Sequence, residues 1–499
     1  MISKELRTKA QDFLQCKRNA NNLVDIIQML EDPSCIMPCL LTIENIFIEV
    51  LKRREMYEEI VPLKPKDTSA SAQYRQWLKD CYVETFDKIL CCFSNNKQSI
   101  SNQALSTAMK LISAEGKHPI EPKDDVDYYY PIHRLKAVLI AILSMDTPCP
   151  HLIARFQEYS AYGDTLYFTW KLLPSLTPKK KPSEVFIENY LGLIQNCPLP
   201  KVKADGNDGA NNYVMMCGID GQKDLVIDHV AMRKAVNKCW PCVMNWEHTK
   251  TTHRLLLVVL LERVLPYLDK PILLTDFLMD SLDVGGPISL LALQGVFTLI
   301  QEHNLDYPNI FTKLYSMFEP EIFHTKYKAR LFYLSDIFLS STHLPEHLVA
   351  AFAKRLARLA LIAPPQDIIV ILYFIGNLMV RHPSLKRLIN HPSGAQIQTD
   401  PYIMDERDPT KSQAMDSSLW EISTLQSHCL PSIAQAANFI AQPLPSIEWD
   451  LSNVLENTED DIFDKEIKKR GKEFSLTFER PHGMVLQHGE CLANYWNLF

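Results

Sequence analysis

Glycine is scarce in this sequence, with 15 among 499 residues. Turn-rich β structure depends on glycine at positions of positive φ, so a glycine-poor chain favours helix. No stretch shows the sustained alternation of apolar and polar residues that marks a half-buried strand. We therefore expect an all-α protein.

Long apolar runs are missing as well. The longest, 255–261 and 368–375, fall far short of the ~20 residues that a membrane-spanning helix needs. They predict buried helices, and we expect no membrane insertion. Met1 leads directly into a polar, helix-like segment without the pattern of a signal peptide.

An excess of positive charge is also absent, since the formal net charge is -7. This argues against a protein that coats nucleic acid, and any RNA contact would have to be a local patch. The 13 cysteines are odd in number and follow no framework spacing. We expect a reducing compartment and free thiols, most of them buried.

Catalytic motifs are lacking too. The sequence contains no glycine-rich phosphate loop, no G-x-S-x-G elbow and no H-E-x-x-H pair, so we expect neither an enzyme nor a cofactor. One alternative is a zinc or redox protein using Cys239 and Cys242, which enclose Trp-Pro and precede His248 and His253. The spacer between the cysteine and histidine pairs is shorter than zinc fingers use, and the motif follows an expected helix, not a strand.

Helical periodicity is what the sequence has in abundance. It predicts helices at 132–145, 150–160, 164–173, 183–196, 224–238, 249–266, 270–282, 287–302, 307–318, 322–340, 345–362 and 366–380. Two or three further helices are expected before residue 60, and others between 77 and 112. Successive pairs recur at roughly 40 residues, the period of HEAT-like repeats. The fold we predict is a HEAT/armadillo-like α-solenoid of stacked helical hairpins.

Composition suggests four regions. A helical region covers 1–198, and a linker or insertion rich in Gly, Asn and Asp covers 199–222. A helical-repeat domain follows at 223–445. The last region, 446–499, is first acidic and then basic.

Residues 400–443 carry the densest start, stop and packing signals. Asp400-Pro401 and Asp408-Pro409 each predict a turn that launches a short helix. Ser418 with Glu421 matches a capping box, and a helical hairpin is expected at 419–441. Trp420 would be a core or interface anchor. The alternative is that all these signals describe only local architecture.

This stretch resembles the C-terminal signature of the CCAAT-binding-factor/maintenance-of-killer domain of nucleolar complex proteins. The matching residues are Asp400, Pro401, Tyr402, Asp408, Pro409, Ala414, Ser417, Ser418, Leu419, Trp420, Glu421, Leu425, His428 and Pro431. An opening motif of the same domain resembles the segment that contains Asn304, Tyr307, Pro308, Phe311, Lys313, Leu314 and Tyr315. The signature covers about 290–440, and 457–463 is most similar to the nucleolar complex protein four branch.

The resemblance implies a non-enzymatic assembly factor of the small ribosomal subunit. It implies a nucleolar, nuclear protein that acts in pre-rRNA processing within the small-subunit processome, in a stable complex with nucleolar protein fourteen. Contact with pre-rRNA could be indirect. An alternative, suggested by the domain's name, is a transcription factor that binds CCAAT-box DNA.

Two sets of residues are candidates for binding. For a protein partner they are Tyr307, Pro308, Asp400, Pro401, Tyr402, Asp408, Pro409, Ser418, Trp420 and Glu421. For RNA phosphates they are Lys354, Arg355 and Arg358, which lie together at helical spacing. The alternative for the second set is an ordinary solvated helix face.

Overall fold

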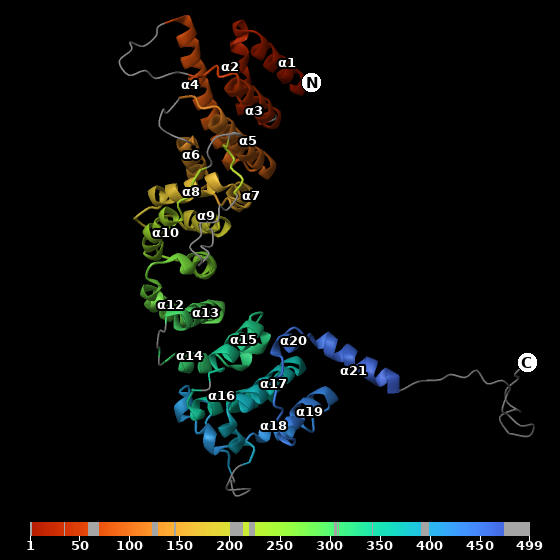
Figure 1. Cartoon of the computed structure of the whole chain (residues 1–499). Coiled ribbons are helices and arrows are strands. Elements are labelled where there is room, and N and C mark those ends of the chain that lie inside the picture. Colours follow the sequence, from red (N-terminus) through yellow and green to blue (C-terminus); the bar gives the residue numbers. More distant parts are fainter. Residues whose placement is uncertain are drawn as a thin grey trace, which may run out of the picture. The chain divides into compact units, whose positions relative to one another are not determined.

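The computed structural model describes residues 2–33, 35–57, 69–121, 128–143, 146–199, 213–218, 225–303, 307, 309–341, 343–390 and 399–473. Every regular element among these residues is a helix, so the predicted all-α class is confirmed. No helix in these ranges is long and apolar enough to cross a membrane. Contacts divide the chain into two compact units, Met1–Asn304 and Leu305–Phe499 (Figure 1).

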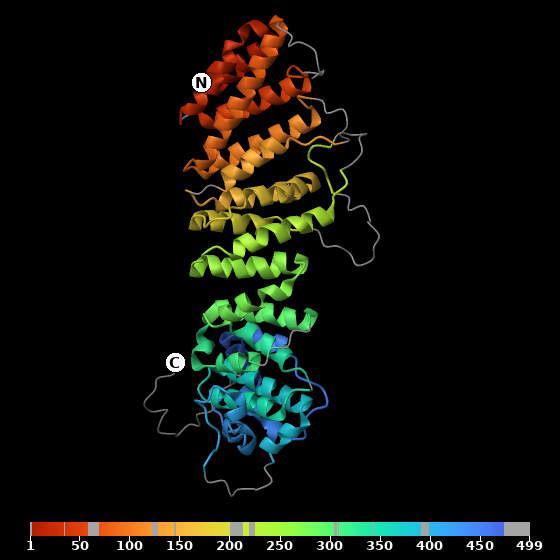
Figure 2. The same cartoon turned by 90° about the vertical axis from the view of Figure 1, so that its left-hand side faces the viewer.

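The first unit is a stack of helices. They are α1 (Ile2–Gln15), α2 (Asn21–Gln28), α3 (Ile36–Lys52), α4 (Ala70–Cys91), α5 (Gln98–Lys117), α6 (Ile132–Ile142), α7 (Pro150–Ser160), α8 (Gly163–Leu176), α9 (Glu184–Asn196), α10 (His229–Met244), α11 (Lys250–Val259), α12 (Thr275–Leu282) and α13 (Gly286–His303). Figure 2 shows them as successive layers in chain order.

Contacts in this unit join every second helix. One row runs α3–α5–α7–α9–α11–α13, and a second row runs α4–α6–α8–α10. Each helix therefore buries one face on its predecessor and one on its successor within a row. That is the arrangement of an α-solenoid, in which no single hairpin could bury its apolar face alone. The predicted solenoid is confirmed here.

Several helix starts follow from local sequence chemistry. The side chains of Ser69, Ser183, Asp228 and Thr249 each accept a hydrogen bond from the backbone N–H three residues on. Such caps satisfy donors that the first helical turn leaves without a partner. The starts of α4, α9, α10 and α11 are thus fixed by the sequence.

A short crossing segment, 213–218, is held by Asp164 of α8. The buried carboxylate of Asp164 accepts hydrogen bonds from the backbone N–H groups of Met216 (3.1 Å) and Cys217 (2.8 Å). The hydroxyl of Tyr128 donates to the same carboxylate at 2.5 Å. This side chain ties together parts of the first unit that are far apart in sequence.

The second unit is built around α16 (Glu346–Ala360). The unit also contains α14 (Ile310–Ser316), α15 (Lys328–Phe338), α17 (Pro365–Arg381), α18 (Trp420–Leu425), α19 (Pro431–Ala437), α20 (Leu451–Leu455) and α21 (Glu459–Glu473). α16 contacts α17, α18 and three short 3-10 turns, and most of its residues are buried. A helix enclosed on nearly every side is the centre of its unit.

Predicted and observed helices differ in several places. The helix expected at 270–282, for example, begins as a 3-10 turn, Pro271–Leu274, before α12. The helix expected at 224–238 begins at His229 and continues to Met244, so Pro241 lies inside it. The helix expected at 322–340 is a 3-10 turn, Pro320–His324, followed by α15. The boundary proposed at 199–222 falls within the first unit, and the fourfold division of the chain stays a prediction.

Candidate partner-binding arm

Residues 399–421, here called the arm, cross α16 and end in the first turn of α18. Two 3-10 turns shape it, Pro409–Lys411 and Ala414–Asp416, and both contact α16. Asp408 accepts a hydrogen bond from the backbone N–H of Thr410 at 3.0 Å, so Asp408-Pro409 launches a helical turn as predicted. Gln413 adopts a left-handed conformation, with φ of 56°, and turns the chain between the two.

Asp400 holds the two ends of the arm together. Its Oδ1 accepts hydrogen bonds from the backbone N–H of Tyr402 at 3.1 Å and from the hydroxyl of Ser417. Its Oδ2 accepts the indole N–H of Trp420 at 2.8 Å. Burial alone would raise the pKa of Asp400, but these bonds and Lys354 outweigh it and hold the pKa well below its usual value.

Lys354 of α16 is the cation beneath the arm, and its side chain is fully buried. Its Nζ lies 2.9 Å from Asp400 Oδ2 and 2.7 Å from Glu421 Oε1, and it donates to the carbonyl of Ser418. Arg358 contacts the same two carboxylates at 2.7 and 2.8 Å. The four charges cancel, as buried ions require.

The two carboxylates differ in environment. Burial raises the pKa of Glu421, and Lys354 and Arg358 oppose that rise without cancelling it. The pKa of Asp400 is lowered because more hydrogen bonds reach its carboxylate. Asp400 is therefore the main charged anchor of the arm.

Arg355 joins the arm to α14. Its guanidinium donates to the carbonyls of Phe318 (2.7 Å) and Met404 (3.0 Å) and lies 4.6 Å from the ring centre of Tyr315. The hydroxyls of Tyr315 and Tyr402 are hydrogen-bonded at 2.7 Å. The opening motif and the arm thus meet through a pair of buried tyrosines.

The anchored arm leaves two apolar side chains at its surface. Ile403 is 46% exposed and Trp420 is 39% exposed. The Arg358 guanidinium lies 4.7 Å from the centre of a Trp420 ring, a cation–π contact that fixes the indole. The arrangement presents Ile403 and the fixed indole of Trp420 at the surface of the arm.

Comparisons with known proteins address the identity of the chain. The CBF/Mak21 family model matches residues 289–437, and the model "Nucleolar complex protein 4-like, TPR repeats" matches residues 4–181. Nucleolar complex protein 4 homolog A of Xenopus laevis is 38% identical over 99% of this chain and 95% of its own length. The human and chicken homologs are 34% identical over 100% of this chain, and over 98% and 100% of their own lengths.

The chain belongs to the nucleolar complex protein 4 family. This confirms the family resemblance that was based on residues 400–431 and on the opening motif. Its relatives are named as nucleolar proteins, which supports the predicted nuclear and nucleolar localisation. The CBF/Mak21 match includes the whole arm and its anchor helix α16.

The predicted partner-binding residues fall into different environments. Tyr402, Pro409 and Glu421 are buried, while Tyr307, Asp400, Pro401, Asp408 and Ser418 are half-buried, and Trp420 is exposed. Pro308 lies outside the described residues. Most members of the set thus shape and anchor the arm, and their direct role toward a partner stays a proposal.

Two predictions about local structure in the arm are wrong. α18 has Leu419 at its N-cap with no side-chain cap, because the Glu421 carboxylate is drawn to Lys354 and Arg358. Asp400-Pro401 launches no helix, since Asp400 bonds to Tyr402, Ser417 and Trp420 instead. Contacts made in the folded chain overrode both local signals.

The expected basic face on α16 needs a correction. Lys354 and Arg355 are buried and turned toward the arm, so they do not form a solvated surface for RNA phosphates. Arg358 is partly exposed, but it too pairs with Asp400 and Glu421. Helical spacing predicts that these cations lie together. It does not predict whether carboxylates from another segment pair with them.

The cysteine motif lies within α10 and not after a helix. Cys239 is buried, and burial raises the pKa of its thiol, the opposite of what redox catalysis needs. His248 faces the carbonyl of Val243, and His253 faces the hydroxyl of Ser281. Among the described residues no three His, Cys, Asp or Glu side chains are grouped to hold a metal.

Glu448 and Trp449, here called the strap, lie across α17, a contact that the sequence patterns did not predict. The side chain of Asn377 exchanges two hydrogen bonds with the backbone of Trp449, at 2.8 and 2.9 Å. Arg381 contacts Asp336 and Glu448 at 2.7 and 2.6 Å. The sequence contains two signals for this contact. They are the bulky aromatic Trp449 and the acid Glu448, at the start of the region 446–499.

Proposed function

We propose that this protein is a non-enzymatic scaffold in small-ribosomal-subunit assembly that acts in complex with nucleolar protein fourteen. Membership of a family named for a nucleolar complex supports a role in ribosome biogenesis. The solenoid of the first unit supports a scaffold, because stacked helices offer long surfaces to partners. The net charge and the burial of Lys354 and Arg355 offer no support for a CCAAT-box DNA-binding role.

The observation that carries the proposal is the surface left by the arm. Ile403 and Trp420 are exposed apolar side chains on a segment that buried charges hold in place. A preorganised surface loses little conformational entropy on binding, and tryptophan is prominent among residues that dominate interface energies. We assign this surface to an extended segment of nucleolar protein fourteen.

Replacement of Trp420 by Ala tests the assignment. We expect recovery of nucleolar protein fourteen and small-subunit precursor rRNA with the tagged protein to fall, with affinity reduced about thirtyfold for a loss near 2 kcal/mol. Ile403→Ser should act in the same direction. Tyr402 is unsuitable as a test position because its ring is buried against Arg355 and Tyr315.

Tyr333→Ala is the matched control, since Tyr333 is an exposed aromatic of α15 in the same unit. It should leave the complex intact. Circular dichroism should show unchanged helicity in all three variants. Undiminished recovery of the partner by folded Trp420→Ala and Ile403→Ser proteins would refute the assignment.

A further inference from the structure

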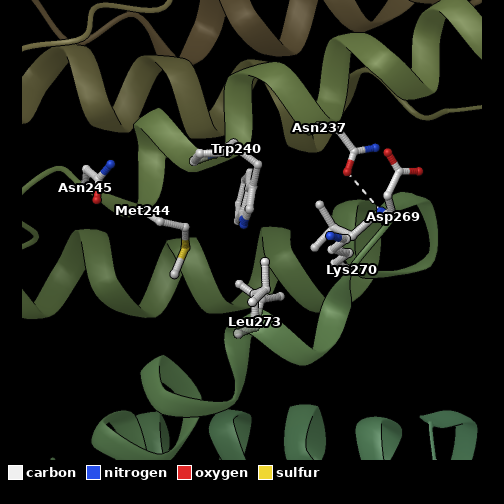
Figure 3. A pocket seen from close by; sticks show the side chains of 10 residues that line it. Asn237, Trp240, Met244, Asn245, Asp269, Lys270 and Leu273 are labelled. Carbon is white, nitrogen blue, oxygen red and sulfur yellow. Dashed lines mark hydrogen bonds between the residues drawn. The ribbon is translucent and has the colours of Figure 1, made fainter.

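Cavities in the two units differ in what they offer a ligand. One of about 510 Å³ lies in the first unit, where Trp240 and Met244 of α10 face Leu273 (Figure 3). The indole nitrogen of Trp240 is buried out of a ligand's reach, and Asp269 is already paired with Arg233, so these walls select no particular ligand. Another cavity, of about 460 Å³, lies in the second unit and is lined by residues of α17, α19 and the segment 438–449.

The cavity of the second unit has an aromatic wall without charge. Tyr373 of α17 and Trp449 of the strap stack with nearly parallel rings, whose centres are 5.7 Å apart. Phe439 meets the Trp449 ring edge-on. None of the described residues that line this cavity is acidic or basic. Because an unpaired charge is costly to bury, the part of a ligand that enters the cavity should be uncharged.

Several polar groups of this cavity are free to bind a ligand. The Tyr373 hydroxyl and the Trp449 indole N–H form no hydrogen bond within the described residues, and neither group is closed off from solvent. The side-chain amides of Gln435, Asn438 and Gln442 line the cavity on exposed residues and are likewise unpaired in the described parts of the chain. All five groups can donate a hydrogen bond. A fitting ligand is therefore rich in acceptors.

The aromatic wall is held in place by groups outside the cavity. Asn377 exchanges hydrogen bonds with the backbone of Trp449 at 2.8 and 2.9 Å, and Arg381 pairs with Glu448 at 2.6 Å. These contacts leave the Trp449 indole N–H and the Tyr373 hydroxyl unused. The wall is thus fixed before a ligand arrives, which lowers the entropy that binding costs.

We propose that this cavity binds a proline-rich segment of a partner protein in the polyproline II conformation. Such a helix has no internal hydrogen bonds, so its carbonyl oxygens are available to the donors around the cavity. Proline lacks an N–H, so the segment brings no backbone donor that needs a partner. Its uncharged rings pack on Tyr373 and Trp449, as proline-rich segments do in aromatic-lined grooves. The site is separate from the arm, because Ile403 and Trp420 do not line it.

The test titrates the full chain into a fluorescently labelled peptide of about ten prolines, which spans about 30 Å as a polyproline II helix. Fluorescence polarisation should show saturable binding that the unlabelled peptide competes away. A flexible Gly-Ser peptide of equal length is the control ligand, and it should not bind because it has no rings and is not preorganised. Absence of saturable binding, or equal binding of both peptides, would overturn the proposal.

Tyr373→Phe connects binding to the cavity. It removes only a hydroxyl that is unpaired within the described residues, so the fold should persist. Loss of one hydrogen bond to the peptide should weaken polyproline binding about fivefold. Gln435→Ala removes an exposed amide from α19 and should act in the same direction. Tyr333→Phe is the matched control, because Tyr333 is an exposed tyrosine of α15 that does not line the cavity. Equal affinities of the two tyrosine variants would refute the site.

Two further measurements distinguish this site from other modes of binding. Leu273→Ser alters an exposed side chain of the cavity in the first unit and should leave polyproline binding unchanged. Weaker binding by that variant would place the peptide in the first unit and refute the assignment. A uridine oligonucleotide should not displace the peptide. Displacement would indicate that the aromatic wall stacks on nucleobases, and it would overturn the assignment to a proline-rich segment.

Discussion

Asp400 illustrates how one residue can serve a role that its neighbours in sequence do not reveal. Followed by proline, it has the features of a helix cap. In the folded chain its carboxylate contacts Lys354, Arg358, Ser417 and Trp420 instead. The sequence signature singled out this residue, but its two charged partners, Lys354 and Arg358, come from a helix more than forty positions away.

Asp400→Asn should destabilise the second unit. The amide keeps the shape but removes the charge that balances Lys354 and Arg358, and breaking a buried ion pair costs about 3 kcal/mol. Urea unfolding would measure the loss. Asp416→Asn is the control, because Asp416 is an exposed acid of the same arm. Equal stabilities of the two variants would contradict the role given to Asp400.

The pH dependence of this effect has a definite sign. The folded pKa of Asp400 lies below its unfolded value of about 4, so its contribution is complete above that value and is lost as the pH falls through the folded pKa. The stability gap between the unaltered protein and Asp400→Asn should therefore be constant from pH 7 to about 5 and shrink below about 4. A gap that widens on acidification would exclude this explanation.

At the scale of elements, the second unit depends on two segments laid across helices. The arm crosses α16, and the strap of Glu448 and Trp449 crosses α17. Trp449 stacks on Tyr373, with ring centres 5.7 Å apart, and lies against Gly376. The helices themselves were predictable from periodicity, whereas the segments that cover them have no periodic signal.

Gly376→Ala should loosen the strap. A Cβ at this position would lie 2.5 Å from the Trp449 ring. The ring cannot move away freely, because the side chain of Asn377 is hydrogen-bonded to the backbone of Trp449. Overpacking of about 1–3 kcal/mol outweighs the helix gain of about 1 kcal/mol from replacing glycine. We expect faster amide hydrogen exchange at 447–455.

Gly471→Ala provides the control for that experiment. A Cβ at Gly471 of α21 meets nothing within 4 Å, so only the gain in helix propensity applies. Exchange in the strap should stay as it is in the unaltered protein. If exchange at 447–455 in Gly376→Ala were as slow as in the unaltered protein, the Trp449 ring would be able to shift at little cost in free energy, and the prediction would be wrong.

At the scale of the whole molecule, the chain forms two compact units with their own buried anchors. Asp164 fixes the crossing segment of the first unit, and Lys354 with Asp400 fixes the arm of the second. Each unit has its own apolar core. We therefore expect the two units to unfold in separate transitions.

Calorimetry of the full chain should resolve two heat-absorption peaks. Asp400→Asn should lower the midpoint of one peak, and Asp164→Asn should lower the midpoint of the other. Each substitution replaces one acceptor oxygen of a central carboxylate by an NH2 group, which cannot accept the hydrogen bonds made there. Either variant shifting both peaks together would show that the units unfold as one cooperative body.

The sequence by itself determined the helical class, the approximate extent of helices such as α7, α9, α16 and α17, and the family. These follow from local periodicity, caps and a distinctive run of residues, all of which are short-range properties. Tertiary structure alone decided which polar residues are anchors and which are surface. Lys354 looked like a solvated cation and became a buried one, because carboxylates from the arm replace its water. Burial and charge pairing are long-range properties, and one-dimensional spacing does not encode them.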